Sequence, residues 1–294
     1  MIRRILLPLD GSRFAETALQ LAQNLAAAAN AELHLLLVHE PLACVDKKTY
    51  EKLLAWARMG EDEYLSETAA RTGSAGTRCP HKVLQGVPAE VIAKFAKATE
   101  IDLLVMSTHG WGAIKRFWFG SVADRLIREC RAPVLLVRPA EDGTAITGIQ
   151  SILVALDRSG CGEAVLPMVA DLALTLGAEI KLLQVVQPHL QFPSHPEGYM
   201  TFWDPAIIGQ MSQEATVYVG AVAAGLRERG CQVVSHVVLG GVVADPILEQ
   251  AEQGADLVAV ATHGRKGVAR LLPGSVADKV IRGSRSAVLV ARPG

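Results

Sequence analysis

The chain has 294 residues, of which 50% are hydrophobic and 20% are charged, and its formal net charge is -1. This length suggests about two domains, and the composition is that of a globular protein with a buried core. Proteins that bind nucleic acid or a membrane surface usually carry a concentrated basic face, which a balance of this kind does not indicate. We therefore expect neither partner.

The cysteines and the first residues bear on the compartment. The five cysteines are scattered and form no CxxC motif, so a disulfide framework or a zinc site is not expected. The opening MIRRILLPLD holds too short an apolar run for a signal peptide. No apolar run reaches the roughly 20 residues of a membrane helix. We expect a cytoplasmic protein.

The sequence contains a long internal repeat. RRILLPLDGS at the start is matched by QSILVALDRS, and DLLVMSTHG is matched by DLVAVATHG. Each half then continues to a GSVAD segment and to a final apolar run, APVLLVRP or SAVLVARP. A period of this length indicates two homologous domains rather than a solenoid. We place the domains at residues 1–140 and 149–294, joined by a stretch poor in large apolar residues.

Within each half, short apolar runs alternate with helical patterns. ILLPL, LHLLLV, DLLVM and PVLLV lack polar alternation, as strands buried on both faces do. The first helix of each half has apolar residues at helical spacing on one face: Phe14, Ala18, Leu21 and Leu25 in the first, and Val165, Val169, Leu172 and Leu176 in the second. Pro167 is expected to bend or delay the second of these helices. The alternation predicts an α/β fold with a parallel sheet in each half.

Two segments do not fit the alternation. Residues 41–60 and 188–215 fall between the second strand and the next helix, and the second of them is rich in Pro, His and aromatic residues. We expect packed loops or a partner contact there, and a lid over a ligand is the alternative.

The ends of two strands in each half carry the polar candidates. Asp10 and Asp157 end the first strand, and a Thr-His-Gly turn follows a later strand. In open α/β sheets, ligands bind beyond the carboxyl ends of the strands, where the strand order reverses. If the two strands are neighbours, the aspartate and the turn face one crevice.

The GSVAD segments resemble helix starts. Ser121 and Ser275 each precede an acidic residue by three positions, which predicts that each serine is an N-cap. A helix N-terminus leaves N–H groups unpaired and favours phosphate, and Gly120 and Gly274 would let a ligand approach the backbone. The alternative is ordinary helix capping with no ligand. His109 and His263 are interpreted as turn or packing residues rather than bases.

Taken in order, PLDGS, GVPA, DLLVM, THG, GSVAD and PVLLVRP resemble the universal stress protein family, and the resemblance covers both halves. It implies a tandem of two adenine-nucleotide alpha hydrolase-like (Rossmann-like) domains, each a five-stranded parallel sheet with helices on both sides. In the nucleotide-binding branch of the family, ATP or AMP, with or without Mg²⁺, is held by a pattern of G-x-x-G, nine residues, and G-[ST].

Carried onto this chain, the pattern implies that the glycines and the hydroxyl hold phosphate. It also implies that the strand-end aspartate contacts the ribose and that the backbone of a valine contacts the adenine edge. The matching positions are Asp10, Val38, Ser107, Gly110, Gly120, Ser121 and Val122 in the first half, and Asp157, Val185, Ala261, Gly264, Gly274, Ser275 and Val276 in the second. Ser107 and Ala261 stand where the family has its first glycine. The second half has the smaller residues around its cradle and is favoured as the better site.

The resemblance also implies that the last strand of each half lies at a sheet edge. An apolar open edge is a liability that pairing removes, so we expect the two halves to pair as an internal pseudo-dimer. Two chains can then associate as a homodimer.

Three functions follow from this reading. The first is a stress-response regulatory protein that binds adenine nucleotide, and the second is an interaction module without nucleotide. The third, a slow ATP hydrolase, is the least favoured because the chain has no P-loop, GxGxxG or nucleophile motif.

Overall fold

The computed structural model describes residues 1–40, 47–73, 76–108, 120–138, 146–187, 205–262 and 275–292, with the side chains of 47–58 excepted. The first half contains β1 (Arg4–Leu9), α1 (Arg13–Glu16), α2 (Leu19–Ala29), β2 (Glu32–His39), α3 (Lys47–Gly73), β3 (His81–Gln85), α4 (Pro88–Ala98), β4 (Leu103–Ser107), α5 (Ser121–Glu129) and β5 (Val134–Val137). The second contains β6 (Ser151–Leu156), the 3₁₀ helix η1 (Gly162–Val165), α6 (Leu166–Leu176), β7 (Glu179–Val186), α7 (Pro205–Glu228), β8 (Gln232–Leu239), α8 (Ala244–Glu252), β9 (Leu257–Ala261), α9 (Val276–Gly283) and β10 (Ala287–Ala291).

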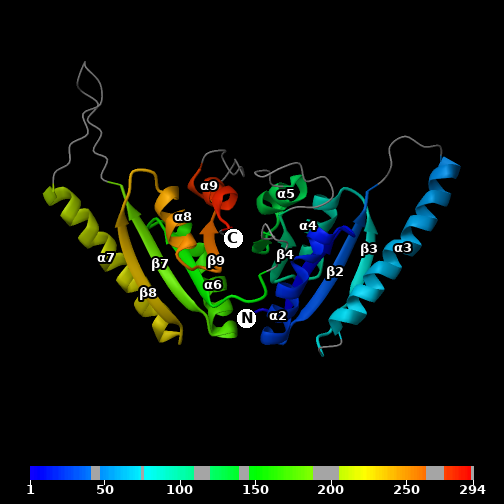
Figure 1. The fold of residues 1–294 in the computed structure, drawn as a ribbon, viewed down its shortest axis with the longest axis horizontal. Helices are drawn as coiled ribbons and strands as arrows, with labels where there is room; N and C mark the ends of the chain where they lie inside the picture. Colours follow the sequence, from blue (N-terminus) through cyan, green and yellow to red (C-terminus); the bar gives the residue numbers. More distant parts are fainter. Residues whose placement is uncertain are drawn as a thin grey trace, which may run out of the picture.

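The strands form one ten-stranded sheet in the order β3-β2-β1-β4-β5-β10-β9-β6-β7-β8. Within each half every pairing is parallel, as the buried apolar runs predict. β5 and β10 pair antiparallel at the centre, and Leu135 lies opposite its counterpart Leu289. The two halves therefore meet through their last strands, related by an approximate twofold axis (Figure 1).

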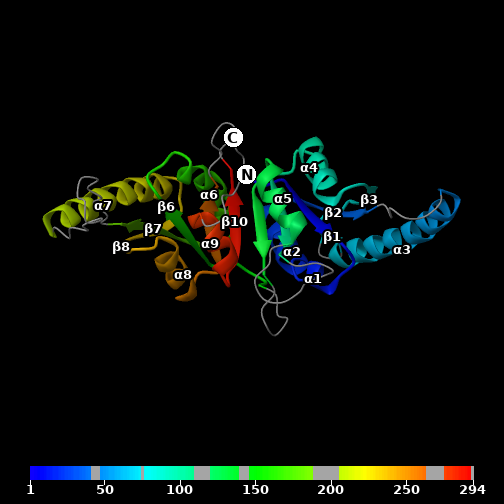
Figure 2. The same ribbon diagram turned by 90° about the horizontal axis from the view of Figure 1, so that it is seen from above.

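Helices cover both faces of this sheet (Figures 1 and 2). One apolar core includes residues of α2, α3, α6 and α7, and the other includes residues of α4, α5, α8 and α9. The strands between them are almost entirely buried, which explains why their sequences show no polar alternation. No helix among the described residues is long and apolar enough to cross a membrane.

The predicted first helix is two helices. α1 is a single turn that ends at Thr17, whose hydroxyl donates to the Phe14 carbonyl at 2.6 Å, and α2 starts at Leu19. The break changes which residues share a face, so the prediction for Phe14 is wrong: it is 48% exposed, whereas Leu21 and Leu25 are buried.

The counterpart in the second half follows the prediction more closely. Pro167 lies in the first turn of α6, after the 3₁₀ turn η1, so it delays the α-helix as expected. Proline is tolerated there because the first N–H groups of a helix have no intrahelical partner. Val165, Val169 and Leu172 are fully buried, and Leu176 packs against the same core.

The two segments that do not fit the alternation are partly helical. α3 begins at Lys47 and α7 at Pro205, so the expected loops are shorter than 41–60 and 188–215. Pro205 is a helix-start signal in the sequence, and it indicates a helix that begins within the segment expected to be a loop. Residues 41–46 and 188–204, where a loop or lid was expected, lie outside the described residues.

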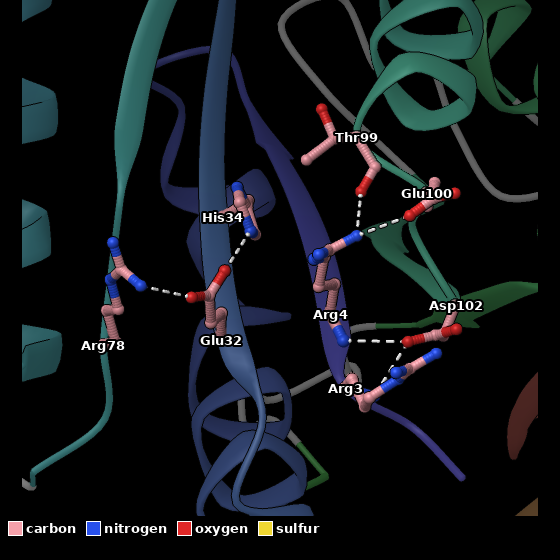
Figure 3. Close-up of polar contacts among 8 residues, drawn as sticks. All are labelled: Arg3, Arg4, Glu32, His34, Arg78, Thr99, Glu100 and Asp102. Atoms are coloured by element: carbon pink, nitrogen blue, oxygen red, sulfur yellow. Dashed lines mark hydrogen bonds and ion pairs between the residues drawn. The ribbon is translucent and has the colours of Figure 1, made fainter.

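The amino ends of the strands are tied by a repeated carboxylate. Asp102, before β4, accepts hydrogen bonds from the backbone N–H groups of Arg3 (2.8 Å) and Arg4 (2.9 Å) at the start of β1 (Figure 3). Asp256 does the same for Gln150 and Ser151 before β6. These contacts fix the two central strands of each half relative to one another, at the end of the sheet opposite the candidate site.

Mutation of the central strand pair, β5 and β10, tests how much this pairing contributes to stability. We expect Leu289→Ala to lower the free energy of unfolding by about 2–5 kcal/mol, because the side chain is fully buried. The matched control Leu174→Ala, in α6 with a side chain 47% exposed, should change it by about 0.5 kcal/mol or less. Urea denaturation followed by circular dichroism measures both, and equal losses would contradict this account of the joint.

Candidate functional site

The strand order reverses between β1 and β4 in the first half and between β6 and β9 in the second. β1 pairs with β4 through Ile5 and Leu103, and β6 pairs with β9 through Ile152 and Leu257. The strand that ends in the aspartate and the strand before the Thr-His-Gly turn are therefore neighbours in both halves. The chain leaves β1 towards the face of α2 and leaves β4 towards the face of α5. In such sheets ligands bind beyond the carboxyl ends of the strands, at this point of reversal.

The strand-end aspartates form the same turn in both halves. Asp10 Oδ1 accepts from the Ser12 N–H at 2.9 Å, and Asp157 Oδ1 accepts from the Ser159 N–H at 2.9 Å. Both aspartates are exposed at the carboxyl end of their strands. Ser12 in turn caps α1, accepting from the Ala15 N–H at 3.1 Å. The aspartates thus order the loop that follows the first strand of each half.

The residue after each aspartate has a left-handed backbone. Gly11 has φ +78°, which costs glycine nothing, whereas Arg158 has φ +63° in the equivalent place. Left-handed backbone disfavours a residue with a Cβ by about 1–2 kcal/mol. Arg158 also pairs with Glu214 of α7 at 3.2 Å. The turn geometry is therefore kept in the second half despite the loss of the glycine.

The two helices that follow the later strand start differently. In α9, Ser275 is the N-cap, and its Oγ accepts from the Asp278 N–H at 3.2 Å, as predicted. In α5 the N-cap is Gly120 and no side chain caps the helix, so the prediction for Ser121 is wrong. The Asp124 N–H bonds to the Gly120 carbonyl at 3.0 Å, which starts the helical ladder one residue earlier. Ser121 is left exposed in the first turn.

Gly120 connects the helix start to the end of β4. Its N–H donates to the Thr108 carbonyl at 3.2 Å, and a Cβ at Gly120 would lie 3.5 Å from that oxygen. An ordinary contact of this kind means that Gly120 is not required by the fold there. In the second half, the Cys161 thiol donates to the Thr262 carbonyl at 3.8 Å. This contact joins the loop after β6 to the end of β9 directly.

The structure describes six of the remaining predicted residues, three in each half. Ser107 is buried at the end of β4 and Ala261 is half-buried at the end of β9. Val38 and Val185 are half-buried near the carboxyl ends of β2 and β7. Val122 packs against the core through its side chain, and Val276 is 39% exposed. Gly110, Gly264, Gly274 and the two histidines of the Thr-His-Gly turns lie outside the described residues.

A tyrosine–glutamate contact that the sequence did not predict occurs in both halves. Tyr64 of α3 donates its hydroxyl to Glu16 Oε1 at 2.9 Å, and Tyr218 of α7 donates to Glu163 Oε1 at 2.7 Å. Burial, followed by the hydrogen bond to the glutamate, raises the pKa of each tyrosine. Each glutamate stands six positions after the strand-end aspartate, the only trace of the contact in the sequence. The contact anchors the long helix of each half to the helical turn that follows the first strand.

No metal site accompanies this arrangement in the described part of the chain, where no three His, Cys, Asp or Glu residues are grouped to hold an ion. The carboxylates that follow the first strands make local contacts instead, in the Asp10 and Asp157 turns and as the glutamate acceptors of the two tyrosines. The described geometry provides hydrogen-bonding groups at two parallel strand ends and a helix N-terminus.

A comparison with protein families places the chain. The model of the universal stress protein family matches residues 1–138 and again residues 148–292. The chain belongs to the universal stress protein family. A universal stress protein of Thermus aquaticus is 34% identical over 139 residues, which cover 47% of this chain and 100% of the relative. The single-domain relative therefore corresponds to one half.

Longer relatives match across both halves. A universal stress protein of Mycobacterium tuberculosis is 30% identical over 205 residues, which cover 66% of this chain and 63% of the relative. The aligned part thus spans less than two thirds of that protein. The crystal structure of a universal stress protein from Archaeoglobus fulgidus shares the fold, with a TM-score of 0.72 and 21% identity, and the match covers 99% of this chain and 98% of that one.

The tyrosine–glutamate contacts predict a pH dependence of stability. Because folding raises the tyrosine pKa above its usual value of 10.0, the unfolded chain loses its phenolic proton first. The stabilisation is fully present below pH 10.0 and is lost as the pH rises above it. Tyr64→Phe and Tyr218→Phe should each lower stability at neutral pH by about 1 kcal/mol, the net value of one hydrogen bond.

Urea denaturation at pH 8 and at pH values above 10 measures this dependence. The double Tyr→Phe variant should lose less stability between these conditions than the wild type, because it lacks both groups. A double variant with the same loss as the wild type would mean that lysines and other groups account for the alkaline transition.

Proposed function

We propose that this universal stress protein is a regulatory adenine-nucleotide binder with a cradle for ATP or AMP in each half. One observation supports it most: in both halves the aspartate turn stands at the end of a strand that lies parallel and next to the later strand, at the point of strand reversal, and a helix follows that later strand in the chain. Family membership agrees with this assignment.

Phosphate would bind at the helix starts. The first turn of α5 or α9 presents backbone N–H groups, and the helix dipole adds partial positive charge. Gly120 leaves room for phosphate because, among the described residues outside its immediate chain neighbours, the Thr108 carbonyl alone lies within 4 Å of the position its Cβ would take. Hydrogen bonds to charged oxygens contribute about 1.5–3 kcal/mol each, so a few of them give micromolar binding, about -8 kcal/mol.

The nucleoside would extend towards the neighbouring strands. Asp10 or Asp157 is exposed at the end of the first strand and is the group proposed to meet the ribose hydroxyls. The backbone of Val38 or Val185, on the next strand along, is proposed to meet the adenine edge. β1 lies between β2 and β4, so the three contacts follow one line across the carboxyl ends.

The two cradles differ in how the serine is held. Ser275 Oγ accepts from the Asp278 N–H, which leaves its O–H oriented to donate to a phosphate oxygen. The Ser121 hydroxyl has no such contact among the described residues and would have to be ordered by the ligand. Since preorganisation lowers the entropy cost of binding, we infer that the second half is the tighter site.

Isothermal titration of the full chain with ATP, ADP and AMP, with and without Mg²⁺, tests the proposal. We expect micromolar binding of at least one of them, and no heat with any nucleotide would overturn it. Gly120→Leu should weaken binding in the first half more than tenfold, because the side chain occupies the phosphate position.

The matched control is Gly225→Leu, in α7, where a Cβ meets nothing within 4 Å. Circular dichroism should show that both variants keep the fold. If Gly120→Leu leaves every site unchanged in affinity, phosphate does not bind at the start of α5 and any binding observed belongs elsewhere.

A further inference from the structure

The two halves exchange arginines across the central strand pair. Arg138, directly after β5, donates through Nη2 to the Arg282 carbonyl at 3.0 Å, with a longer contact to the Ile281 carbonyl at 3.5 Å. Arg292, directly after β10, donates through Nη1 to the Arg128 carbonyl. Each arginine thus leaves the last strand of one half and caps the last turn of a helix in the other half.

The contacts are equivalent, so the structure contains the same arrangement twice. Arg138 corresponds to Arg292 in the repeat, and Arg128 corresponds to Arg282. Burial lowers the pKa of Arg138, whose guanidinium is held against carbonyl oxygens rather than a carboxylate. A cation at a helix C-terminus complements the partial negative charge of the last carbonyl groups. The antiparallel pairing of β5 with β10 brings each arginine within reach of the opposite helix.

The capped helices are the two that start at the proposed phosphate cradles. α5 runs from Gly120 to the carbonyl that Arg292 holds, and α9 runs from Ser275 to the carbonyl that Arg138 holds. Both are short, with 9 and 8 residues. In so short a helix, loosening the last turn disturbs the first, because helix formation is cooperative.

Side chains connect the two ends of each helix. The Arg128 guanidinium pairs with Asp124 at 2.6 Å, and the Asp124 N–H bonds to the Gly120 carbonyl at 3.0 Å. In α9, Arg282 pairs with Asp278 at 2.8 Å, and the Asp278 N–H bonds to Ser275 Oγ. The side chain of the arginine in the last turn of each helix therefore pairs with an aspartate near the start of that helix. The backbone carbonyl of the same arginine accepts from the arginine of the other half.

Each capping arginine also follows a residue that is hydrogen-bonded to the end of the later strand of its own half. The Thr262 N–H, after β9, donates to the Ala291 carbonyl at 3.0 Å, next to Arg292. The Thr108 N–H donates to the Val137 carbonyl at 3.0 Å, next to Arg138. A continuous set of contacts therefore joins the end of β9 to the start of α5, and an equivalent set joins the end of β4 to the start of α9.

From this reciprocal arrangement we propose that Arg292 is a positioning residue for the phosphate-binding helix of the first half and that Arg138 is one for the helix of the second half. The inference rests on the proposed function for its binding readout. Neither arginine is placed in contact with nucleotide. Each acts by holding the far end of a helix whose start forms the cradle of the opposite half.

The test is a crossed pattern of affinities in the full chain. Arg292→Ala should weaken nucleotide binding in the first half by about two- to fivefold, the range expected for a cation at a helix C-terminus, and should leave the second unchanged. Gly120→Leu is expected to weaken binding in the first half more than tenfold, so titration of ATP and AMP in that background reports mainly on the second half. There, adding Arg138→Ala should weaken binding about as much, and adding Arg292→Ala should have no effect.

Arg292→Lys and Arg138→Lys are the conservative controls. Lysine keeps the charge at the helix C-terminus, so each should restore part of the lost affinity in the opposite half only. If an alanine variant does not fold, the lysine variants are compared with each other by the same crossed titration. Equal weakening of both halves by one arginine would overturn the proposal, since that is the result of general destabilisation.

Hydrogen exchange without nucleotide separates this inference from the proposed function. Arg292→Ala should speed the exchange of amides in α5 and not those in α9, and Arg138→Ala should do the reverse. If no nucleotide binds the wild type but this pattern holds, the proposed function fails and the trans-positioning stands. If nucleotide binds but neither arginine gives the crossed pattern in exchange or affinity, only the trans-positioning is wrong.

Discussion

The antiparallel pairing of β5 with β10 is the contact on which the rest of the structure depends. It converts two parallel sheets, each with an apolar last strand, into one sheet of ten strands. Val134 to Val137 and Ala287 to Ala291 are almost wholly buried as a result. Left open, either strand would present unpaired backbone groups beside apolar side chains, which favours aggregation. The same pairing brings the capping arginines of each half to the helix of the other.

The sequence was sufficient for the central strands but not for the outer ones. Strands buried on both faces are continuous apolar runs, and these were found in their correct places. β3 and β8 lie at the two open edges of the sheet, where side chains such as His81 and Gln232 are exposed, so no such run marks them. The break at Thr17 was also not predictable from spacing, because Phe14 fits the helical period that α2 continues.

Contacts near the candidate site were predictable only in part, and only where they are local. The capping role of Ser275 depends on a residue three positions away and was predicted, whereas Gly120 takes the N-cap place expected for Ser121. The turns that Asp10 and Asp157 form with residues two positions on were not predicted. The Arg138 and Arg292 contacts join residues 144 and 164 positions apart. Only the order of strands in the sheet brings such residues together. The repeated arginine after each last strand was visible in the sequence, but nothing local indicated its partner.

A tandem chain differs from a homodimer in that its halves can diverge at equivalent positions. At the carboxyl end of β2, His39 Nδ1 contacts Glu61 Oε1 at 2.8 Å. The corresponding residues of the second half are Val186 and Ala215, which are buried and apolar. This difference lies beside Val38 and Val185, where the base is proposed to bind. The shared sheet and the crossed arginines require the two halves to keep the same framework, whereas the ends of the second strands are free of that requirement. Divergence there can give the two halves different ligands without disturbing the joint.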